Sequence, residues 1–272
     1  MKYLAADPAP CLQPFILRYY QINGYTSEHQ PYREFTFPNG FTSMVLHFEE
    51  PIQVSNVGYD GRHIPRSYIF GKYTKPVFVN HAFGAADVFG VIFHPGRFHL
   101  FLSLPQQELT NQLLDVADGL GEEMPDVLDR MYHNPSFQAR INILERFFVK
   151  KLRYKDFRLD VVDAVVNHIV QDAGKTKVYQ LARKFGLSRQ HLNRLFLPRL
   201  GLNVKEYSRT IRFNFALRAI LSGGCADLLQ AAVDFGYHDE SHLIKDFHDF
   251  TKGRPSEFLG EDNELARFLM PE

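Results

Sequence analysis

Two stretches about fifty residues apart repeat one pattern, and this repeat constrains the fold more than any other feature of the 272-residue chain. The first stretch is GLSRQHLNRLF, residues 186–196, and the second is FGYHDESHLIKDF, residues 235–247. In each, a short apolar segment leads to a glycine and a turn, and a capping residue then starts a helix with one apolar and one polar face. Each stretch therefore predicts a helix-turn-helix motif.

The spacing of matched residues indicates that the two motifs are copies of one another. Positions of the supporting helix recur at a spacing of 50, and those of the following helix at a spacing of 51, after one insertion in the turn. The matched residues are Leu181, Ala182, Phe185, Gly186, Ser188, Leu192 and Phe196 in the first copy, and Ala231, Ala232, Phe235, Gly236, Asp239, Leu243 and Phe247 in the second. A long helix over residues 204–221 is expected to link the two lobes.

The polar face of each second helix predicts contacts with DNA. At about 100° per residue, Gln190, Asn193 and Arg194 lie opposite the apolar side, and amides suit adenine while arginine suits guanine. An amphipathic helix on any protein surface also carries such residues, but the repeat favours DNA. We expect base contacts from these three residues, a phosphate contact from Arg189, and contacts to a second groove from Ser241 and Lys245.

Residues 156–259 resemble the DNA-binding domain of the AraC/XylS family of bacterial transcription regulators. The resemblance is carried by Ser188, Leu192, Arg194, Phe196, the 201–207 closure, Arg212, Ala216, Phe235, Gly236, Ser241, Phe247 and the 253–255 turn. It implies an all-α domain whose two recognition helices enter successive major grooves, about 34 Å apart. It implies double-stranded DNA as the partner, with RNA polymerase, a small-molecule effector and a second copy of the chain as further partners, and no cofactor or enzymatic activity.

Some residues depart from the family pattern. Pro198 is expected to end the first recognition helix early, because it lacks the N–H group and clashes with the carbonyl of Arg194. Glu240, Asp246 and Asp249 bring negative charge to the second lobe, although Glu240 stays among the expected DNA-binding residues. We expect the second lobe to bind DNA more weakly than the first. A second lobe that binds a protein partner is the alternative.

The charge of the chain is divided unevenly. The formal net charge is zero, but residues 150–259 carry +7, residues 1–149 carry −4 and the tail from residue 260 carries −3. A basic C-terminal half beside an acidic N-terminal half is typical of a DNA-binding module joined to a sensing domain. Cys11 and Cys225 form no metal or redox motif, and neither a secretory signal nor a membrane span is visible, so we expect a cytoplasmic protein without bound metal.

The N-terminal half has a period of two rather than 3.6. Short apolar runs over residues 32–37, 41–48, 52–57, 77–83 and 88–93 predict an antiparallel sheet closed into a small barrel or sandwich. Helices are expected over residues 97–104, 105–114, 122–132 and 136–152. The fold class is therefore α+β, with a sensor domain at 1–152, a linker at 153–158, the DNA-binding domain at 159–259 and a tail at 260–272.

The segment GVIFHPGRF, residues 90–98, together with residues 38–48, resembles the cupin-like sensor domains of AraC-type regulators. The resemblance implies a pocket for a small effector inside the barrel, with Arg33 or Arg97 near an anionic group. The apolar residues expected there are Phe35, Phe37, Met44, Leu46, Phe48, Phe78 and Phe93, although each could equally fill the core.

Two alternatives for the N-terminal half stay open. The histidines 47, 81, 94 and 99 suggest a cupin-like enzyme or metal sensor, but the chain lacks a His-x-His pair with a downstream glutamate. Residues 122–152 could form a dimer surface or cover the sheet. The apolar residues concerned are Val127, Met131, Ile141, Leu144 and Phe148.

Overall fold

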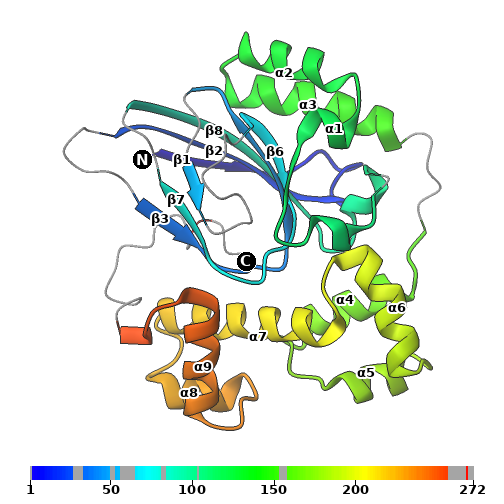
Figure 1. The fold of residues 1–272 in the computed structure, drawn as a ribbon, viewed down its shortest axis with the longest axis vertical. Helices are drawn as coiled ribbons and strands as arrows, with labels where there is room; N and C mark the ends of the chain where they lie inside the picture. Colours follow the sequence, from blue (N-terminus) through cyan, green and yellow to red (C-terminus); the bar gives the residue numbers. More distant parts are fainter. Residues whose placement is uncertain are drawn as a thin grey trace.

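The computed structural model describes residues 2–26, 33–49, 53–55, 65–80, 84–102, 104–152, 158–256 and 268. The strands lie in the N-terminal part of the chain, and the C-terminal part is helical and lies beside one end of the sheet (Figure 1). The α+β class is confirmed.

Nine strands among the described residues form two antiparallel sheets. The larger sheet has the order β1 (Lys2–Ala6), β2 (Ile16–Thr26), β8 (Gly84–Phe93), β4 (Thr42–His47), β6 (Ser67–Phe70) and β9 (Leu113–Asp115). The smaller sheet has the order β3 (Arg33–Thr36), β7 (Val77–Asn80) and β5 (Gln53–Ser55). Of the barrel or sandwich that the sequence predicts, the closed barrel is not formed among these residues, because β1 and β9 lie at opposite edges of the larger sheet and leave it open. The sheet-rich character of the N-terminal part is confirmed.

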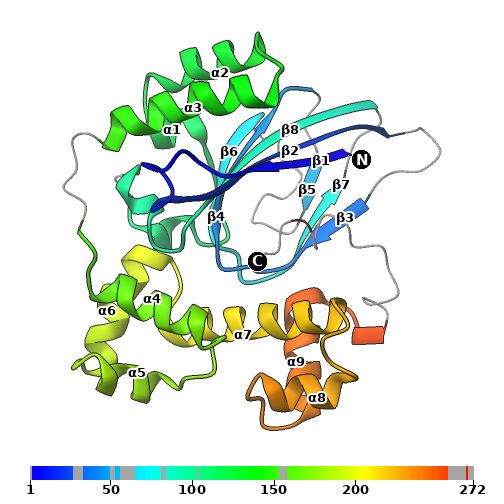
Figure 2. The same ribbon diagram turned by 180° about the vertical axis from the view of Figure 1, so that it is seen from behind.

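Alternate residues of the larger sheet bury themselves on opposite faces. Tyr19, Phe89 and Val91 pack in the cluster that includes the helices α1 (Val116–Leu120), α2 (Met124–Tyr132) and α3 (Phe137–Leu152). Their neighbours Tyr20 and Val88 belong to a separate cluster on the other face. Figure 2 shows α2 and α3 stacked over one side of the sheet. The larger sheet therefore has two buried faces.

A buried ion pair joins α3 to the sheet. Arg140 is 1% exposed, and its two terminal nitrogens donate to the two carboxylate oxygens of Asp87 at 2.8 Å each. The guanidinium also lies 3.7 Å from the centre of the Phe48 ring. This bidentate geometry is the arrangement in which a buried arginine is best stabilised.

The two helices expected over residues 97–104 and 105–114 are absent from the described part of this region. Short 3₁₀ turns, η1 (Phe98–Leu100) and η2 (Gln106–Leu109), take their place, followed by β9, which pairs with β6. Phe98, Phe101 and Leu109 are all buried. Apolar residues spaced three to four apart, which predicted helices, thus belong here to short turns that anchor the connection to the core.

The C-terminal part has two lobes connected by one long helix. The first lobe contains α4 (Val161–Gln171), α5 (Val178–Lys184) and α6 (Arg189–Leu200); the second contains α8 (Leu228–Asp234) and α9 (Glu240–Thr251). The helix α7 (Val204–Leu221) supplies Tyr207 and Ile211 to the first core and Phe213 and Leu217 to the second. Figure 1 shows α7 running between the lobes beneath the sheet.

The prediction that Pro198 ends the first recognition helix early is wrong. The helix α6 runs through Pro198 to Leu200, and Gly201, at φ 74°, closes it with an N–H bond to the carbonyl of Leu197. Phe196 and Leu200 on its inner face are fully buried. Proline removes one backbone hydrogen bond, whereas burial of these two side chains stabilises the packed helix by about 2 kcal/mol each.

The N-terminal part contributes directly to the packing of both lobes. Phe37 lies in the core of the second lobe, 6.0 Å from the Phe213 ring centre in an edge-on arrangement. The amide of Asn214 donates to the carbonyl of Pro38 at 2.8 Å, and the hydroxyl of Thr110 donates to the carbonyl of Gly201 at 2.6 Å. The two parts therefore share buried apolar and polar contacts.

Candidate nucleic-acid interface and interdomain cavity

The first recognition helix, α6, presents a polar face to solvent. Ser188 caps it by accepting a hydrogen bond from the His191 N–H at 3.1 Å. Arg189, Gln190 and Arg194 are exposed, whereas the apolar side of the helix is buried. These three expected DNA-binding residues therefore lie on the open side of the lobe.

Asn193 is placed differently. It is half-buried, and its side-chain oxygen accepts a hydrogen bond from the Val204 N–H at 3.1 Å. That N–H belongs to the first turn of α7, where no partner exists within the helix. Asn193 thus connects the recognition helix to the linking helix.

The second recognition helix, α9, repeats this arrangement. Asp239 caps it through the His242 N–H at 2.8 Å, and Leu243 and Phe247 are buried. Ser241 and Lys245 are exposed, and Glu240 is half-buried at the first helical position. The helix therefore also presents a polar surface to solvent.

The acidic residues Asp246 and Asp249 face the linking helix. Arg209 of α7 donates to Asp246 at 2.8 Å and also pairs with Asp249, and Asp246 is only 1% exposed. Burial alone would lower the pKa of Arg209, but its hydrogen bonds to the two carboxylates raise it. The two carboxylates are thus paired with an arginine within the lobe. Their negative charge is therefore a weaker reason to expect poor binding of DNA by the second lobe. This pairing has no local sequence signal, because Arg209 lies 37 and 40 residues from its partners.

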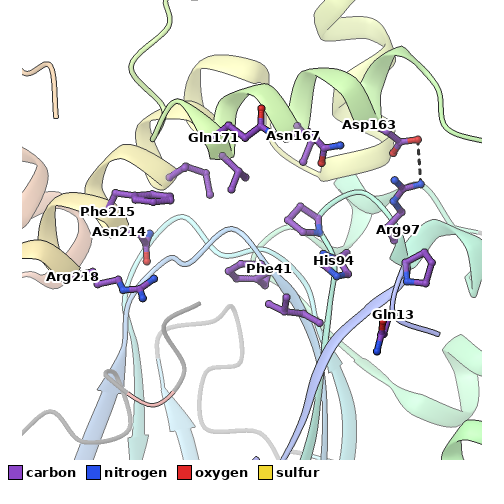
Figure 3. A pocket seen from close by; sticks show the side chains of 16 residues that line it. Gln13, Phe41, His94, Arg97, Asp163, Asn167, Gln171, Asn214, Phe215 and Arg218 are labelled. Carbon is purple, nitrogen blue, oxygen red and sulfur yellow. Dashed lines mark ion pairs between the residues drawn. The ribbon is translucent and has the colours of Figure 1, made fainter. Parts of the chain in front are cut away.

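A cavity of about 540 Å³ lies between the N-terminal part and the helices α4 and α7. Figure 3 shows the side chains of α4 and α7 facing those of the N-terminal loops across it. Its lining residues are Gln13, Pro14, Leu17, Phe41, His94, Pro95, Arg97, Asp163, Val166, Asn167, Val170, Gln171, Ile211, Asn214, Phe215 and Arg218.

The walls of the cavity are mostly apolar, and a positive residue lies at each end. Arg218 and Arg97 stand at opposite ends in Figure 3. Arg97 pairs with Asp163 at 3.2 Å, and burial lowers its pKa. Burial, and then the nearby Arg97, also lower the pKa of His94, so its imidazole is neutral at pH 7. Such a site suits a largely apolar molecule with an anionic group.

Five of the apolar residues expected to line an effector pocket inside the barrel pack in hydrophobic cores instead. Met44, Leu46, Phe48 and Phe93 fill the core beneath the helices, and Phe37 packs in the second lobe. Arg97 faces the cavity between the two parts of the chain. The side chains of Arg33, Phe35 and Phe78 lie outside the described residues. No local feature of the sequence indicates this cavity, because five separate segments of the chain build it.

The histidines do not gather into a metal site in the described part of the chain. His47 lies 3.4 Å from the Tyr68 hydroxyl, His99 contacts the carbonyl of Gly96 at 2.7 Å, and His94 lines the cavity. His81 lies outside the described residues. Among the residues that the structure describes, no group of three or more histidine, cysteine, aspartate or glutamate side chains could hold a metal ion.

The apolar face of residues 122–152 covers the sheet. Val127 is 7% exposed and the others are buried still more deeply; they are Met131, Ile141, Leu144 and Phe148. This face is therefore occupied within one chain. No helix in the described ranges is long and apolar enough to cross a membrane.

Two family models match separate parts of the chain. Residues 5–115 match a family described as a domain of unknown function, DUF6597, and residues 181–261 match a helix-turn-helix domain. No curated protein matches the sequence. The second match covers α6 and α9 together.

Several solved structures of ToxT from Vibrio cholerae are similar to this chain. One is 14% identical, with 89% of this chain and 97% of that chain covered and a TM-score of 0.50. A second, bound to (E)-4-(8-methylnaphthalen-1-yl)but-3-enoic acid, is 14% identical with a TM-score of 0.49 over 89% and 98% of the chains. A third, bound to an unsaturated fatty acid, is 14% identical with a TM-score of 0.46 over 94% of each. At this identity the likeness concerns the fold.

Proposed function

We propose that this chain, a DNA-binding transcription regulator with an AraC-type helix-turn-helix domain at its C-terminus, contacts DNA through both recognition helices and responds to a small molecule held between its two parts. The proposal divides the chain into a sensor at 1–152, a linker at 153–158, a DNA-binding domain at 159–259 and a tail at 260–272. It makes the chain a non-enzymatic, cytoplasmic protein. One observation carries the DNA contacts: both capped helices bury their apolar faces and leave basic and hydrogen-bonding side chains exposed.

The proposed roles follow from the chemistry of each exposed side chain. Gln190 suits adenine, Arg194 suits guanine and Arg189 suits a phosphate. Asn193 can offer only its amide nitrogen to a base while its oxygen holds the first turn of α7.

In the second groove, Ser241 and Lys245 supply the contacts to DNA, and Glu240 can accept a hydrogen bond from the amino group of cytosine. We place the stronger contribution in the first lobe, because its exposed face carries two arginines and the second carries one lysine.

The DNA contacts are tested by selecting DNA from a random pool with the full-length chain and measuring affinity over a salt series. Arg194→Ala should weaken binding by about 1–3 kcal/mol and relax the base preference at one position. Lys245→Ala should weaken binding less than Arg194→Ala does, and it should reduce the slope of log affinity against log salt concentration by about one. The matched control is Arg130→Ala, an exposed arginine on α2.

Specific binding that survives Arg194→Ala unchanged would contradict the assignment of the first lobe. A greater loss in Lys245→Ala than in Arg194→Ala would reverse the proposed order of the lobes. If Arg130→Ala caused an equal loss, general charge rather than a base contact would explain the result.

We propose the interdomain cavity as the effector site and an amphipathic carboxylate as the chemical class of effector. Apolar walls of Leu17, Phe41 and Phe215 suit a hydrocarbon or aromatic body, and Arg97 and Arg218 suit an anionic group at either end.

A thermal-shift titration of the full-length chain tests the effector site. Dodecanoate should raise the midpoint of unfolding in a concentration-dependent manner, and uncharged dodecanol should raise it less. Arg218→Gln should reduce the shift, whereas Lys75→Gln, on the exposed surface of the N-terminal part, should leave it unchanged. Equal shifts from dodecanoate and dodecanol would reject the anionic group, and no shift with dodecanoate or a panel of shorter and aromatic carboxylates would reject the class.

Two further partners belong to the proposal. RNA polymerase follows from the family resemblance, and a second copy of the chain would have to use a surface other than the α2–α3 face that covers the sheet. Sedimentation of the full-length chain with and without selected DNA measures the oligomeric state.

A further inference from the structure

Four charged side chains form a compact cluster where the cavity meets the first lobe. Asp163 of α4 is 3% exposed and pairs with two arginines, Arg97 at 3.2 Å and Arg199 at 2.9 Å. Arg199 also pairs with Asp160 at 2.6 Å. One buried carboxylate is thus shared between an arginine of the sensor part and an arginine of the DNA-binding part.

The cluster touches the cavity on one side and the first recognition helix on the other. Arg97 and Asp163 line the cavity (Figure 3). Arg199 belongs to the last turn of α6 and also donates to the carbonyl of Gly96, in the N-terminal loop that carries Arg97, at 3.2 Å. The C-terminal end of α6 is therefore fixed to the sensor part by the same group of residues that closes one end of the cavity.

We propose that Arg97, Asp163 and Arg199 transmit the occupancy of the cavity to the first recognition helix. An anionic group bound in the cavity takes Arg97 from Asp163, the loop at Gly96 shifts with Arg97, and Arg199 loses its contact with that loop. This inference rests on the proposed function in one respect, the binding of an anion in the cavity.

The bound anion and Asp163 compete for Arg97, so the two contacts of Arg97 exclude each other. Asp163 holds Arg97 in the unoccupied cavity, and an anion must replace Asp163 before it gains a close contact with the guanidinium. By linkage, any change that frees Arg97 from Asp163 strengthens binding of the anion, and binding of the anion loosens α6 to the same extent in free energy.

The first test needs no anion. Backbone amide exchange in the full-length chain is compared between the wild type and Arg97→Gln. The proposal expects exchange in the last turn of α6, at the amides of residues 197, 199 and 200, to accelerate about tenfold, with Arg97→Lys restoring part of the protection. Amides in the last turn of α9 serve as the internal reference. Unchanged exchange in α6 would overturn the proposal whether or not any anion binds.

The second test uses dodecanoate and DNA selected by the wild-type chain. Arg199→Gln removes the contact with Gly96 that the anion has to break, so dodecanoate should bind at least as tightly as to the wild type while no longer changing the affinity for DNA. Asp163→Asn should bind dodecanoate roughly tenfold more tightly, because it releases Arg97. Thermal midpoints of both variants, measured without dodecanoate, control for loss of fold.

The outcomes distinguish failure of the proposed effector class from failure of the proposed connection between the cavity and α6. Absence of dodecanoate binding in the wild type, with accelerated exchange in Arg97→Gln, rejects this effector class but supports the connection between the loop and α6. Tight binding with an undiminished response of DNA affinity in Arg199→Gln supports the cavity as an effector site but overturns the role of the three residues.

Discussion

Lys72 offers a test of burial energetics in the N-terminal part. It is 3% exposed, and its ammonium group donates to the Thr42 hydroxyl at 3.3 Å. Burial lowers the pKa of Lys72 from 10.5 to about 7. Folding therefore carries a cost at neutral pH, because the lysine either loses its proton or keeps a charge in an apolar site.

The magnitude follows from the two pKa values. A tenfold change in proton affinity corresponds to about 1.4 kcal/mol, so the full cost is at most about 5 kcal/mol. It is complete below pH 7, decreases as pH rises through the interval between 7 and 10.5, and vanishes above it. Lys72→Met removes this cost but leaves the Thr42 hydroxyl without its partner, a loss of about 1–2 kcal/mol. We expect a net gain in stability of about 3 kcal/mol at pH 6.5 and about zero at pH 9.5.

Urea unfolding followed by circular dichroism at pH 6.5, 8 and 9.5 measures this difference. The control is Lys75→Met, because Lys75 is an exposed lysine three residues away, and its replacement should change stability by less than about 0.5 kcal/mol at every pH. A Lys72→Met variant that is less stable than wild type at pH 6.5, or a gain that does not shrink as pH rises, would refute the reasoning.

Three further changes test other contacts. Asp87→Ala should lower the free energy of unfolding by about 3–5 kcal/mol, because it leaves the buried Arg140 unpaired, and Arg140→Met in the same chain should recover part of the loss in urea unfolding. Pro198→Ala should raise stability by about 1–3 kcal/mol by restoring a hydrogen bond to the Arg194 carbonyl, and DNA selection should return the same sequence preference. Asn193→Ala should cost about 1 kcal/mol in thermal unfolding through loss of the hydrogen bond from the Val204 N–H, and it should weaken DNA binding less than Arg194→Ala does.

The helical part of the fold was largely accessible from the sequence. Glycine turns, capping residues and apolar positions with a helical period are local signals, and the duplicated motif made them consistent with one another. The prediction that Pro198 ends α6 is wrong because the packing of Phe196 and Leu200 outweighs one missing hydrogen bond, and this packing depends on contacts with α4 and α7, which are distant in sequence.

The N-terminal sheet was harder to predict. Alternating residues indicated strands, but the openness of the sheet depends on which strands meet, and β9 pairs with β6 across more than forty residues. The turns at η1 and η2 share their apolar spacing with helices, so periodicity alone could not separate the two.

The recognition helices and the cavity differ in what a sequence can reveal. Exposed polar residues on α6 and α9 follow from helical geometry alone. The role of Asn193 as a cap, the pairing of Asp246 with Arg209, and the meeting of Arg97 with Asp163 all require the tertiary arrangement, because each joins side chains on different elements.

The position of Phe37 limits how freely the two halves of this protein can be recombined. It comes from the N-terminal part but fills the core around Phe213 and Phe247. A chimera that grafts another N-terminal domain onto residues 159–259 would leave a hole the size of a benzyl group in the second lobe, at a cost of about 3–5 kcal/mol. An exchanged N-terminal domain therefore preserves the second lobe only if it supplies an aromatic side chain at this point.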